Sequence, residues 1–126
     1  MYVWGWNDVL RDYRLRGSVF DTTPEAKGAI RANFPRGVMT VSADGGREGS
    51  GILGAATPSA SSLYDTVAGT LRAFDASDVS HELWNSDQNF DRDFLGAFAK
   101  FAQPAVVHGK VYAPTFSNRL VVYGLY

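Results

Sequence analysis

The two ends of the chain carry the same pattern of large side chains. Residues 2–15 align without gaps onto residues 112–125, and the alignment matches Tyr2 to Tyr112, Trp6 to Phe116, Leu10 to Leu120, Tyr13 to Tyr123 and Leu15 to Leu125. A third copy of the centre of this pattern is Leu71-Arg-Ala-Phe74, which matches Leu10-Arg-Asp-Tyr13. An internal repeat constrains the fold strongly, because each copy builds the same unit and neighbouring units bury one another's faces.

The spacing of the copies and their local pattern predict a propeller-like β-structure. The repeated leucines lie about 50 to 60 residues apart, and the polar run Thr57–Gly69 is interpreted as a loop insertion that lengthens one interval. Apolar residues alternate with polar ones over short runs, which is the period of half-buried strands. A period of roughly 40 to 50 residues built only of strands is that of a four-stranded propeller blade.

About ten strands are expected, separated by glycine-rich or polar turns. They are Tyr2–Gly5, Leu10–Leu15, Ser18–Asp21, Gly37–Ser42, Gly51–Ala55, Thr70–Phe74, Glu82–Asn85, Ala105–Val107, Lys110–Thr115 and Arg119–Leu125. Helical spacing of apolar residues occurs only in Phe90–Phe101, and Gly96 in its middle weakens a helix. The sequence therefore predicts an all-β fold.

Two segments resemble a known family. The segment Gly69-Thr-Leu-Arg-Ala-Phe-Asp-Ala-Ser-Asp-Val-Ser-His-Glu-Leu-Trp84 resembles a strand that ends in Ala-Phe-Asp-Ala, followed by a turn and a strand that ends in Leu-Trp. The segment Phe101-Ala-Gln-Pro-Ala-Val-Val-His-Gly-Lys-Val-Tyr112 resembles the start of the next blade. Both patterns are similar to those of the quinoprotein-like β-propellers, whose blades carry pyrroloquinoline-quinone-type repeats.

This resemblance covers nearly the whole chain and is weakest at residues 25–35 and 56–68. It implies that Ala73, Asp75 and Trp84 form a docking motif, in which the aromatic ring wedges between adjacent blades and the carboxylate holds the turn. The chain departs from the family pattern at Ser77–His81, where the family has a Thr-Gly-Lys turn and one residue fewer.

The repeat also predicts in which strand of a blade residues 1 and 126 lie. Residue 1 falls in the second strand of one blade and residue 126 in the third strand of another, so the chain resembles the C-terminal two to three blades of a larger propeller. We expect residues 1–126 to form a single partial β-propeller domain of roughly two and a half four-stranded blades. Open strand edges, including Arg119–Tyr126, pair readily with other chains. The sequence therefore predicts a homo-oligomer, a dimer first and a trimer next, in which copies rebuild a ring or sandwich.

Composition limits the partners and the compartment. Twelve basic against thirteen acidic residues give a net charge of -1, which argues against nucleic acid or an anionic membrane as the main partner. The chain has no cysteine, so thiolate metal sites and thiol nucleophiles are excluded. No signal peptide or membrane anchor is recognised in the sequence. The localisation therefore stays open, although proteins of the resembled family are typically periplasmic or secreted.

One acidic segment is a candidate cation site. Oxygen-bearing side chains recur at every second position in Asp87, Asn89, Asp91 and Asp93, and calcium prefers several carboxylate and amide oxygens close together. The match to a calcium loop is incomplete, because Arg92 occupies the sixth position, where glycine is required, and the twelfth-position glutamate is missing. The alternative is a solvated polar loop whose acids cap a helix.

For the other potentially reactive residues, a turn or surface position fits the sequence better than a catalytic or metal-binding role. His81 lacks the second histidine of the zinc-protease pattern, and His108 is expected in a tight surface turn. Ser50 lies in a glycine-rich hairpin without the first glycine of a nucleophile elbow. Arg11–Arg16 is interpreted as an exposed strand face. Lys100 is interpreted as a lysine whose aliphatic stem packs beside aromatic rings.

Three functions remain open, and no catalytic residue is identified. The first is a self-associating structural or binding module, with a small-molecule ligand possible. The second is a hydrolase of activated esters, lactones or phosphoesters that uses a divalent cation in a reassembled propeller channel. The third is a remnant of a quinone-dependent dehydrogenase, which the resemblance suggests. The few blades and the lack of a cysteine pair argue against a bound quinone.

Overall fold

The chain is an all-β protein in its computed structural model, which describes residues 1–124. Apart from one short helix, α1 (Phe90–Asp93), its regular elements are strands. The strands are β1 (Tyr2–Trp4), β2 (Val9–Asp12), β3 (Leu15–Arg16), β4 (Val19–Phe20), β5 (Ala26–Arg31), β6 (Val38–Ser42), β7 (Ile52–Pro58), β8 (Gly69–Asp75), β9 (Glu82–Asn85), β10 (Ala105–Val107), β11 (Lys110–Pro114) and β12 (Leu120–Tyr123).

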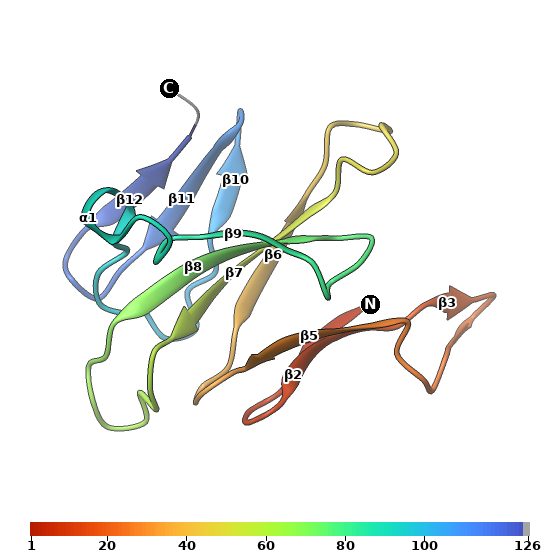
Figure 1. Cartoon of the computed structure of the whole chain (residues 1–126), viewed down its shortest axis with the longest axis horizontal. Helices are drawn as coiled ribbons and strands as arrows, with labels where there is room; N and C mark the ends of the chain where they lie inside the picture. The colour runs from red at the N-terminus through yellow and green to blue at the C-terminus, as the bar shows by residue number, and fades with distance from the viewer. Residues whose placement is uncertain (125–126) are drawn as a thin grey trace.

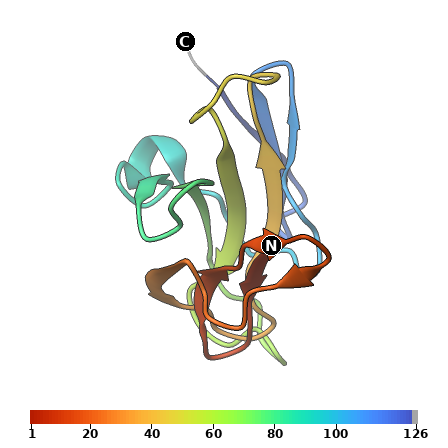
Figure 2. The same cartoon turned by 90° about the vertical axis from the view of Figure 1, so that its right-hand side faces the viewer.

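The strands form three main antiparallel sheets and one small hairpin. The first sheet has the order β1-β2-β5, the central sheet β6-β7-β8-β9, and the last sheet β10-β11-β12, while β3 and β4 pair only with each other. Figure 1 shows the central sheet between the other two, with the last sheet (blue) on one side and the first (red to brown) on the other. The view turned by 90° shows the same separation of the red and blue strands (Figure 2).

The contact between the first and central sheets is a dense apolar core. Trp4, Leu10, Leu53 and Phe74 are each at most 2% exposed, and the rings of Trp4 and Phe74 meet edge to face with centroids 5.7 Å apart. Gly37 has to be glycine for this packing, since a Cβ built there would lie 2.6 Å from Trp4 Cε3. The backbone therefore touches the indole directly, and burial of these large side chains fixes the two sheets together.

A second core joins the central sheet to the last one. Leu71, Leu95 and Ala113 are buried in it, and partly buried Trp84 and Tyr123 pack against them. The Trp84 and Tyr123 rings meet edge to face at 5.6 Å, so the Trp84 side chain wedges between two sheets. In the preceding turn, the Ser77 backbone N–H donates to Asp75 Oδ1 at 2.7 Å. The docking motif that the family resemblance implies for Ala73, Asp75 and Trp84 stays a prediction.

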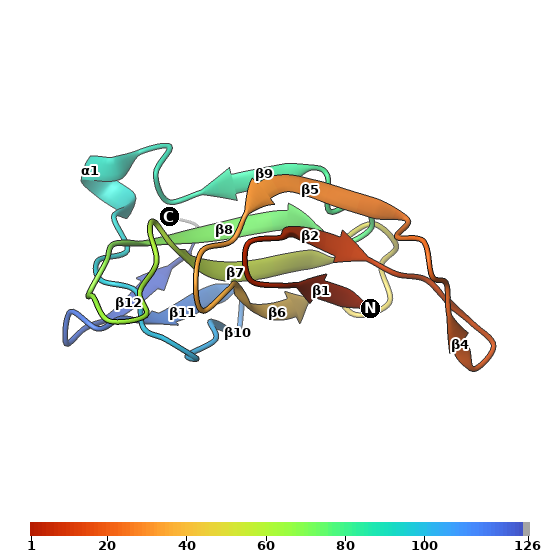
Figure 3. The same cartoon turned by 90° about the horizontal axis from the view of Figure 1, so that it is seen from below.

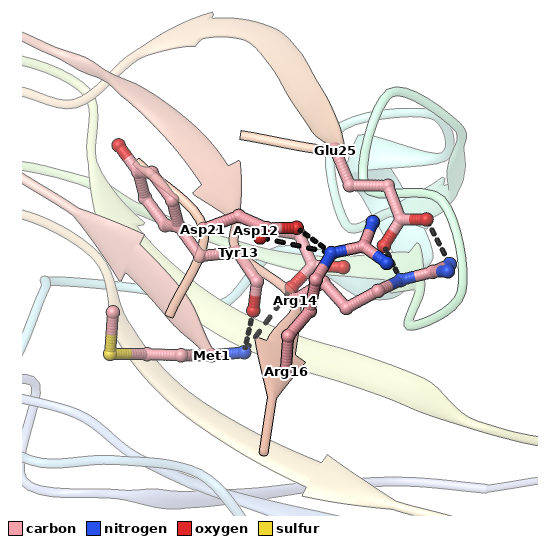
Figure 4. A network of polar contacts seen from close by, with 7 residues as sticks. All are labelled: Met1, Asp12, Tyr13, Arg14, Arg16, Asp21 and Glu25. Carbon is pink, nitrogen blue, oxygen red and sulfur yellow. Dashed lines mark hydrogen bonds and ion pairs between the residues drawn. The ribbon is translucent and has the colours of Figure 1, made fainter. Parts of the chain in front are cut away.

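The β3–β4 hairpin stands apart from the sheets and is held by charges. Figure 3 shows it projecting beyond the rest of the chain, and Figure 4 shows the polar network at its base. Arg14 pairs with Glu25 and Arg16 with Asp21, while the N-terminal ammonium donates to the Tyr13 carbonyl at 2.7 Å. Leu15, Val19 and Phe20 are more than 40% exposed there. A two-stranded hairpin has little stability of its own, so these pairs tether it.

The strand predictions are confirmed at most positions and incomplete at two. The expected strand Leu10–Leu15 is split into β2 and β3, and β5 was not expected at all. The β5 sequence Ala-Lys-Gly-Ala-Ile-Arg has weak strand propensity, but its Gly28 lets the backbone approach Leu10, whose Cβ would lie 3.3 Å from an added Cβ. Tertiary packing therefore creates this strand.

Three further boundaries differ from expectation. The helix is four residues long and ends before Gly96, whose φ of +97° is incompatible with a helix. Strand β7 extends to Pro58, into the segment interpreted as a loop insertion. The expected last strand Arg119–Leu125 appears as Leu120–Tyr123, and Leu125 and Tyr126 lie outside the described residues. Among residues 1–124, no helix has the length and apolar character to cross a membrane.

Leu10 provides a test of the first core. Leu10→Ala removes a side chain that is 1% exposed, so we expect a loss of about 2–5 kcal/mol in the free energy of unfolding, measured by denaturant titration. The matched control is Leu15→Ala, because Leu15 is 54% exposed and its truncation should cost no more than about 0.5 kcal/mol. Equal effects of both changes would contradict the assigned core.

Candidate functional site

Two residues of the predicted cation site make hydrogen bonds to other protein groups. The Asp87 carboxylate accepts a hydrogen bond of 2.8 Å from the Thr70 hydroxyl, and the Asp93 carboxylate is held by two hydrogen bonds of 2.6 Å from Arg92. These bonds hold the pKa of the Asp93 carboxyl below its ordinary value. Asn89 precedes α1 without making a side-chain cap, and Asp91 is exposed in the first turn.

Two of the four predicted ligands are thus engaged with other protein groups. Among residues 1–124, no group of three or more histidine and acidic side chains is close enough to hold a metal ion. The predicted calcium site remains a sequence-based hypothesis.

The remaining reactive residues occupy surface positions. Ser50 donates its hydroxyl to the Arg47 carbonyl at 2.7 Å within the hairpin between β6 and β7. His108 lies in the turn between β10 and β11 with a φ of +49°, and His81 is exposed in the turn before β9. The Lys100 ammonium donates to the Leu63 carbonyl at 3.2 Å. These placements agree with the turn and surface interpretations from the sequence.

A cleft of about 740 Å³ lies between the central and last sheets. Its floor is the face of the central sheet, where Gly54, Ala73 and Trp84 stand in one row across β7, β8 and β9. Its opposite wall is built by Val111, Val121 and Tyr123. The space exists because the middle of the floor carries a glycine and an alanine, and the facing valines are too short to fill the gap.

Several polar residues belong to the lining of this cleft. At one margin Tyr123 donates its hydroxyl to the Asp93 carbonyl at 2.9 Å, beside the Arg92–Asp93 pair. Ser42 and Lys110 also belong to the lining, and the pairing of Lys110 with Val107 puts the Lys110 side chain on the side of the last sheet that faces away from the central sheet. Arg72 contributes no charge to the interior, because its guanidinium bonds to Thr57 and Glu82 on the other face of the sheet.

Burial of its ring raises the pKa of Tyr123 to about 12, and the negative charge of Asp93 acts in the same direction. The phenol is therefore a neutral donor over the physiological range. The cleft offers an apolar lining and a neutral hydroxyl.

A second feature is an uncovered apolar face on the last sheet. Its strand register places Leu120 beside Pro114, and Val122 beside Tyr112 and Ala105, all on the side that faces away from the central sheet. Leu120 is 60% exposed and Val122 is 48% exposed. We call the outward side chains of Ala105, Val107, Tyr112, Pro114, Leu120 and Val122 the outer face.

The internal repeat shows what covers the equivalent positions elsewhere. Leu120 corresponds to Leu10, which is 1% exposed because the central sheet covers it, and to Leu71, which is 3% exposed because the last sheet covers it. In two copies of the pattern, this leucine packs against the next sheet along the chain. In the third copy, no next sheet is present among the described residues.

Searches with family models, among curated proteins and among solved structures found no match for this chain.

Sequence reasoning predicted open strand edges and missed both the apolar outer face and the cleft. The repeat alignment already matched Leu120 to Leu10, so a covering partner was predictable. The cleft depends on which residues of different strands share a row, such as Gly54 and Ala73. The pairing of β7 with β8 across a long loop determines which residues share this row. In the sequence, only the small size of Gly54 and Ala73 indicated a cleft there.

The raised pKa of Tyr123 predicts how the stability of the fold changes in alkaline solution. Its pKa is raised from the ordinary value of 10.0 to about 12 in the fold, so the folded state retains a proton that the unfolded state loses. The stabilisation is fully present below pH 10 and declines as pH rises toward 12. We expect Tyr123→Phe to remove this part of the alkaline destabilisation, measured by denaturant titration at several pH values. An unchanged pH dependence would contradict the assignment.

The calcium hypothesis has a direct test. If calcium binds the segment from Asp87 to Asp93, replacing Asp87, Asp91 and Asp93 by asparagine abolishes the heat of calcium binding in a calorimetric titration. The control is Asp44→Asn with Asp65→Asn, which removes acids far from α1 in exposed loops. Binding that survives the triple change would place the cation elsewhere.

Proposed function

We propose that this chain is a β-propeller segment that works as a self-associating structural or binding module. Its three antiparallel sheets have three, four and three strands and stack face to face, and the repeat relates the strands of one sheet to those of the next. Each of these features is expected of consecutive propeller blades. The observation that carries self-association is the outer face of the last sheet.

The outer face has the composition of an interface. Its six side chains are apolar or aromatic, and charge occurs only at its margin, where Lys110 ends the sheet. Contiguous exposed apolar side chains cost free energy in water, and covering them recovers about 25 cal/mol per Å². The repeat indicates that the covering element is another sheet of the same kind, and a second copy of this chain supplies one.

The partner surface is best supplied by the same face of that second copy. The outward face of the first sheet carries Lys27, Arg31 and the Arg11–Asp8 ion pair, and head-to-tail stacking would place these charges against apolar side chains. Two outer faces related by a two-fold axis bury apolar surface on both sides. The proposed assembly is therefore a dimer in which two last sheets stack.

The dimer is tested by placing a charge in the middle of the outer face. We expect the wild-type chain to sediment as a dimer at micromolar concentration, and Leu120→Lys with Val122→Lys to sediment as a monomer with unchanged circular dichroism. Burying two lysines without partners opposes association strongly, so the dissociation constant should rise by at least about tenfold. The matched control is Leu63→Lys, which changes an exposed leucine (44%) in the β7–β8 loop and should leave the dimer intact.

Two results would overturn this proposal. One is a wild-type chain that stays monomeric, and the other is a dimer that tolerates both lysines. A trimer that depends on Lys27 and Arg31 would instead indicate head-to-tail stacking and would also exclude the two-fold dimer. The metal-assisted hydrolase and the quinone-dependent dehydrogenase remain predictions, because no contact among residues 1–124 favours either of them.

A further inference from the structure

We propose that the loops at one end of the sheets dock onto an anionic lipid surface, with exposed aromatic rings in the bilayer interface and basic side chains against the headgroups. This end consists of the β1–β2 turn (5–8), the β5–β6 connection (32–37), the β7–β8 loop (59–68), the segment 94–104 and the β11–β12 turn (115–119). We call these five segments the aromatic loop end. One copy of the chain carries all five, so docking does not require the dimer.

Backbone hydrogen bonds hold the five segments side by side. The bonds run from the N–H of the first residue to the carbonyl of the second in the pairs Asn7–Ala32, Ser62–Phe34, Phe98–Val67 and Phe116–Ala97, at 2.9, 3.0, 2.9 and 2.9 Å. Figure 1 shows the first three segments along the lower edge of the chain. The aromatic loop end is therefore one continuous surface.

The most exposed phenylalanine, tyrosine and tryptophan side chains of residues 1–124 all belong to this surface. Tyr64 is 91% exposed, Phe101 and Phe116 are each 71% exposed, and Trp6 is 67% exposed. Tyr64 and Phe116 line one hollow of about 320 Å³, so rings from the central and last sheets are neighbours. Aromatic rings are enriched where one part of the side chain meets lipid and another meets water.

Basic residues without an ion pair gather at the same end. Arg36, Lys100 and Arg119 lie in its segments and Arg31 ends β5 beside them. The part of the chain that the structure describes contains no ion pair to any of these four residues. Within the same described part, Asp65 is the one acidic residue of the five segments that lacks an ion pair.

The other acidic residues without an ion pair lie outside the aromatic loop end. Glu48, Asp75 and Asp78 stand at the opposite end of the central sheet, and Asp87 and Asp91 stand beside and within α1. The net charge of -1 for the whole chain therefore conceals an end with an excess of basic residues. Anionic headgroups attract basic residues that lie near the membrane surface.

The distribution of the rings favours a lipid surface over a small ligand. Trp6, Tyr64 and Phe116 come from loops of three different sheets, so a partner that meets all of them has to be broad. A bilayer interface accepts each ring separately, and removal of the rings from water drives their insertion. Membrane binding strengthens with the buried apolar area and with attraction to anionic lipids.

The apolar contribution is tested by co-sedimentation of the full chain with vesicles of phosphatidylcholine and phosphatidylserine. We expect saturable binding by the wild-type chain, and binding at least about tenfold weaker by Tyr64→Ser with Phe116→Ser. The matched control is Val19→Ser with Phe20→Ser, which should bind like the wild type. It removes exposed apolar side chains from the β3–β4 hairpin, which projects at the other end of the chain (Figure 3). Circular dichroism verifies that each variant is folded.

Trp6 reports insertion directly. Vesicles whose acyl chains carry bromine quench tryptophans that enter the bilayer, and we expect them to quench the wild-type fluorescence. Trp6→Phe should abolish the quenching and keep the binding, because Trp4 is buried and Trp84 packs between two sheets.

The basic contribution is tested with Arg36→Gln and Arg119→Gln together. Neither side chain makes a hydrogen bond or ion pair within residues 1–124, so the double change leaves the loops intact. It should weaken binding to the phosphatidylserine vesicles by about tenfold. Lys27→Gln with Lys110→Gln removes the same charge at the other end and should leave binding unchanged.

Three outcomes would overturn the docking proposal: no vesicle binding, an equal loss of binding in the hairpin control, and tryptophan fluorescence that the brominated lipid leaves unquenched. Tighter binding of a single-stranded oligothymidylate than of vesicles would also overturn it, because aromatic rings beside basic residues stack on bases as well. Vesicle binding that resists Arg36→Gln with Arg119→Gln would overturn the role of the anionic headgroups.

Discussion

Burial of both faces of the central sheet is the constraint on which the rest of the structure depends. A sheet of four short strands has little stability in isolation, and each neighbouring sheet of three strands has still less. The central sheet joins them because its two faces receive different apolar sets, Leu53 and Phe74 on one side and Leu71 on the other. Alternation of side chains along β8 puts Phe74 on one face and Leu71 on the other, so one strand serves both cores. The order of the sheets follows from this division of β8.

Much of this arrangement was predictable from the sequence, and the repeat is the reason. Leu10, Leu71 and Leu120 each lie in a strand of a different sheet, so the all-β architecture was predictable from the pattern. Strand β5 was not predictable, because its alanines, lysine and glycine have poor strand propensity and pair only when Leu10 is already in place. The local sequence pattern does not predict a strand that forms only through tertiary contacts.

The candidate sites also differ in how far they could be predicted from the sequence. The outer face was implied by the alternation of residues in Lys110–Pro114 and by the repeat. The acidic segment could not be predicted in this way. Asp87 and Asp93 are close in sequence, but their spacing did not indicate that Thr70 and Arg92 would hold their carboxylates by hydrogen bonds. Partners that come from other strands or from a neighbouring residue decide whether an oxygen is available as a ligand.

The two interfaces of the central sheet differ in how fully they are packed, and this gives the molecule one stiff joint and one compliant joint. Trp4 presses against the backbone at Gly37, so the first sheet has no room to shift. The last sheet faces Gly54 and Ala73 across open space, and its contacts are concentrated around Leu95, Trp84 and Tyr123. Displacements of one sheet against its neighbour will therefore concentrate at the second joint, with the Trp84–Tyr123 contact as the pivot.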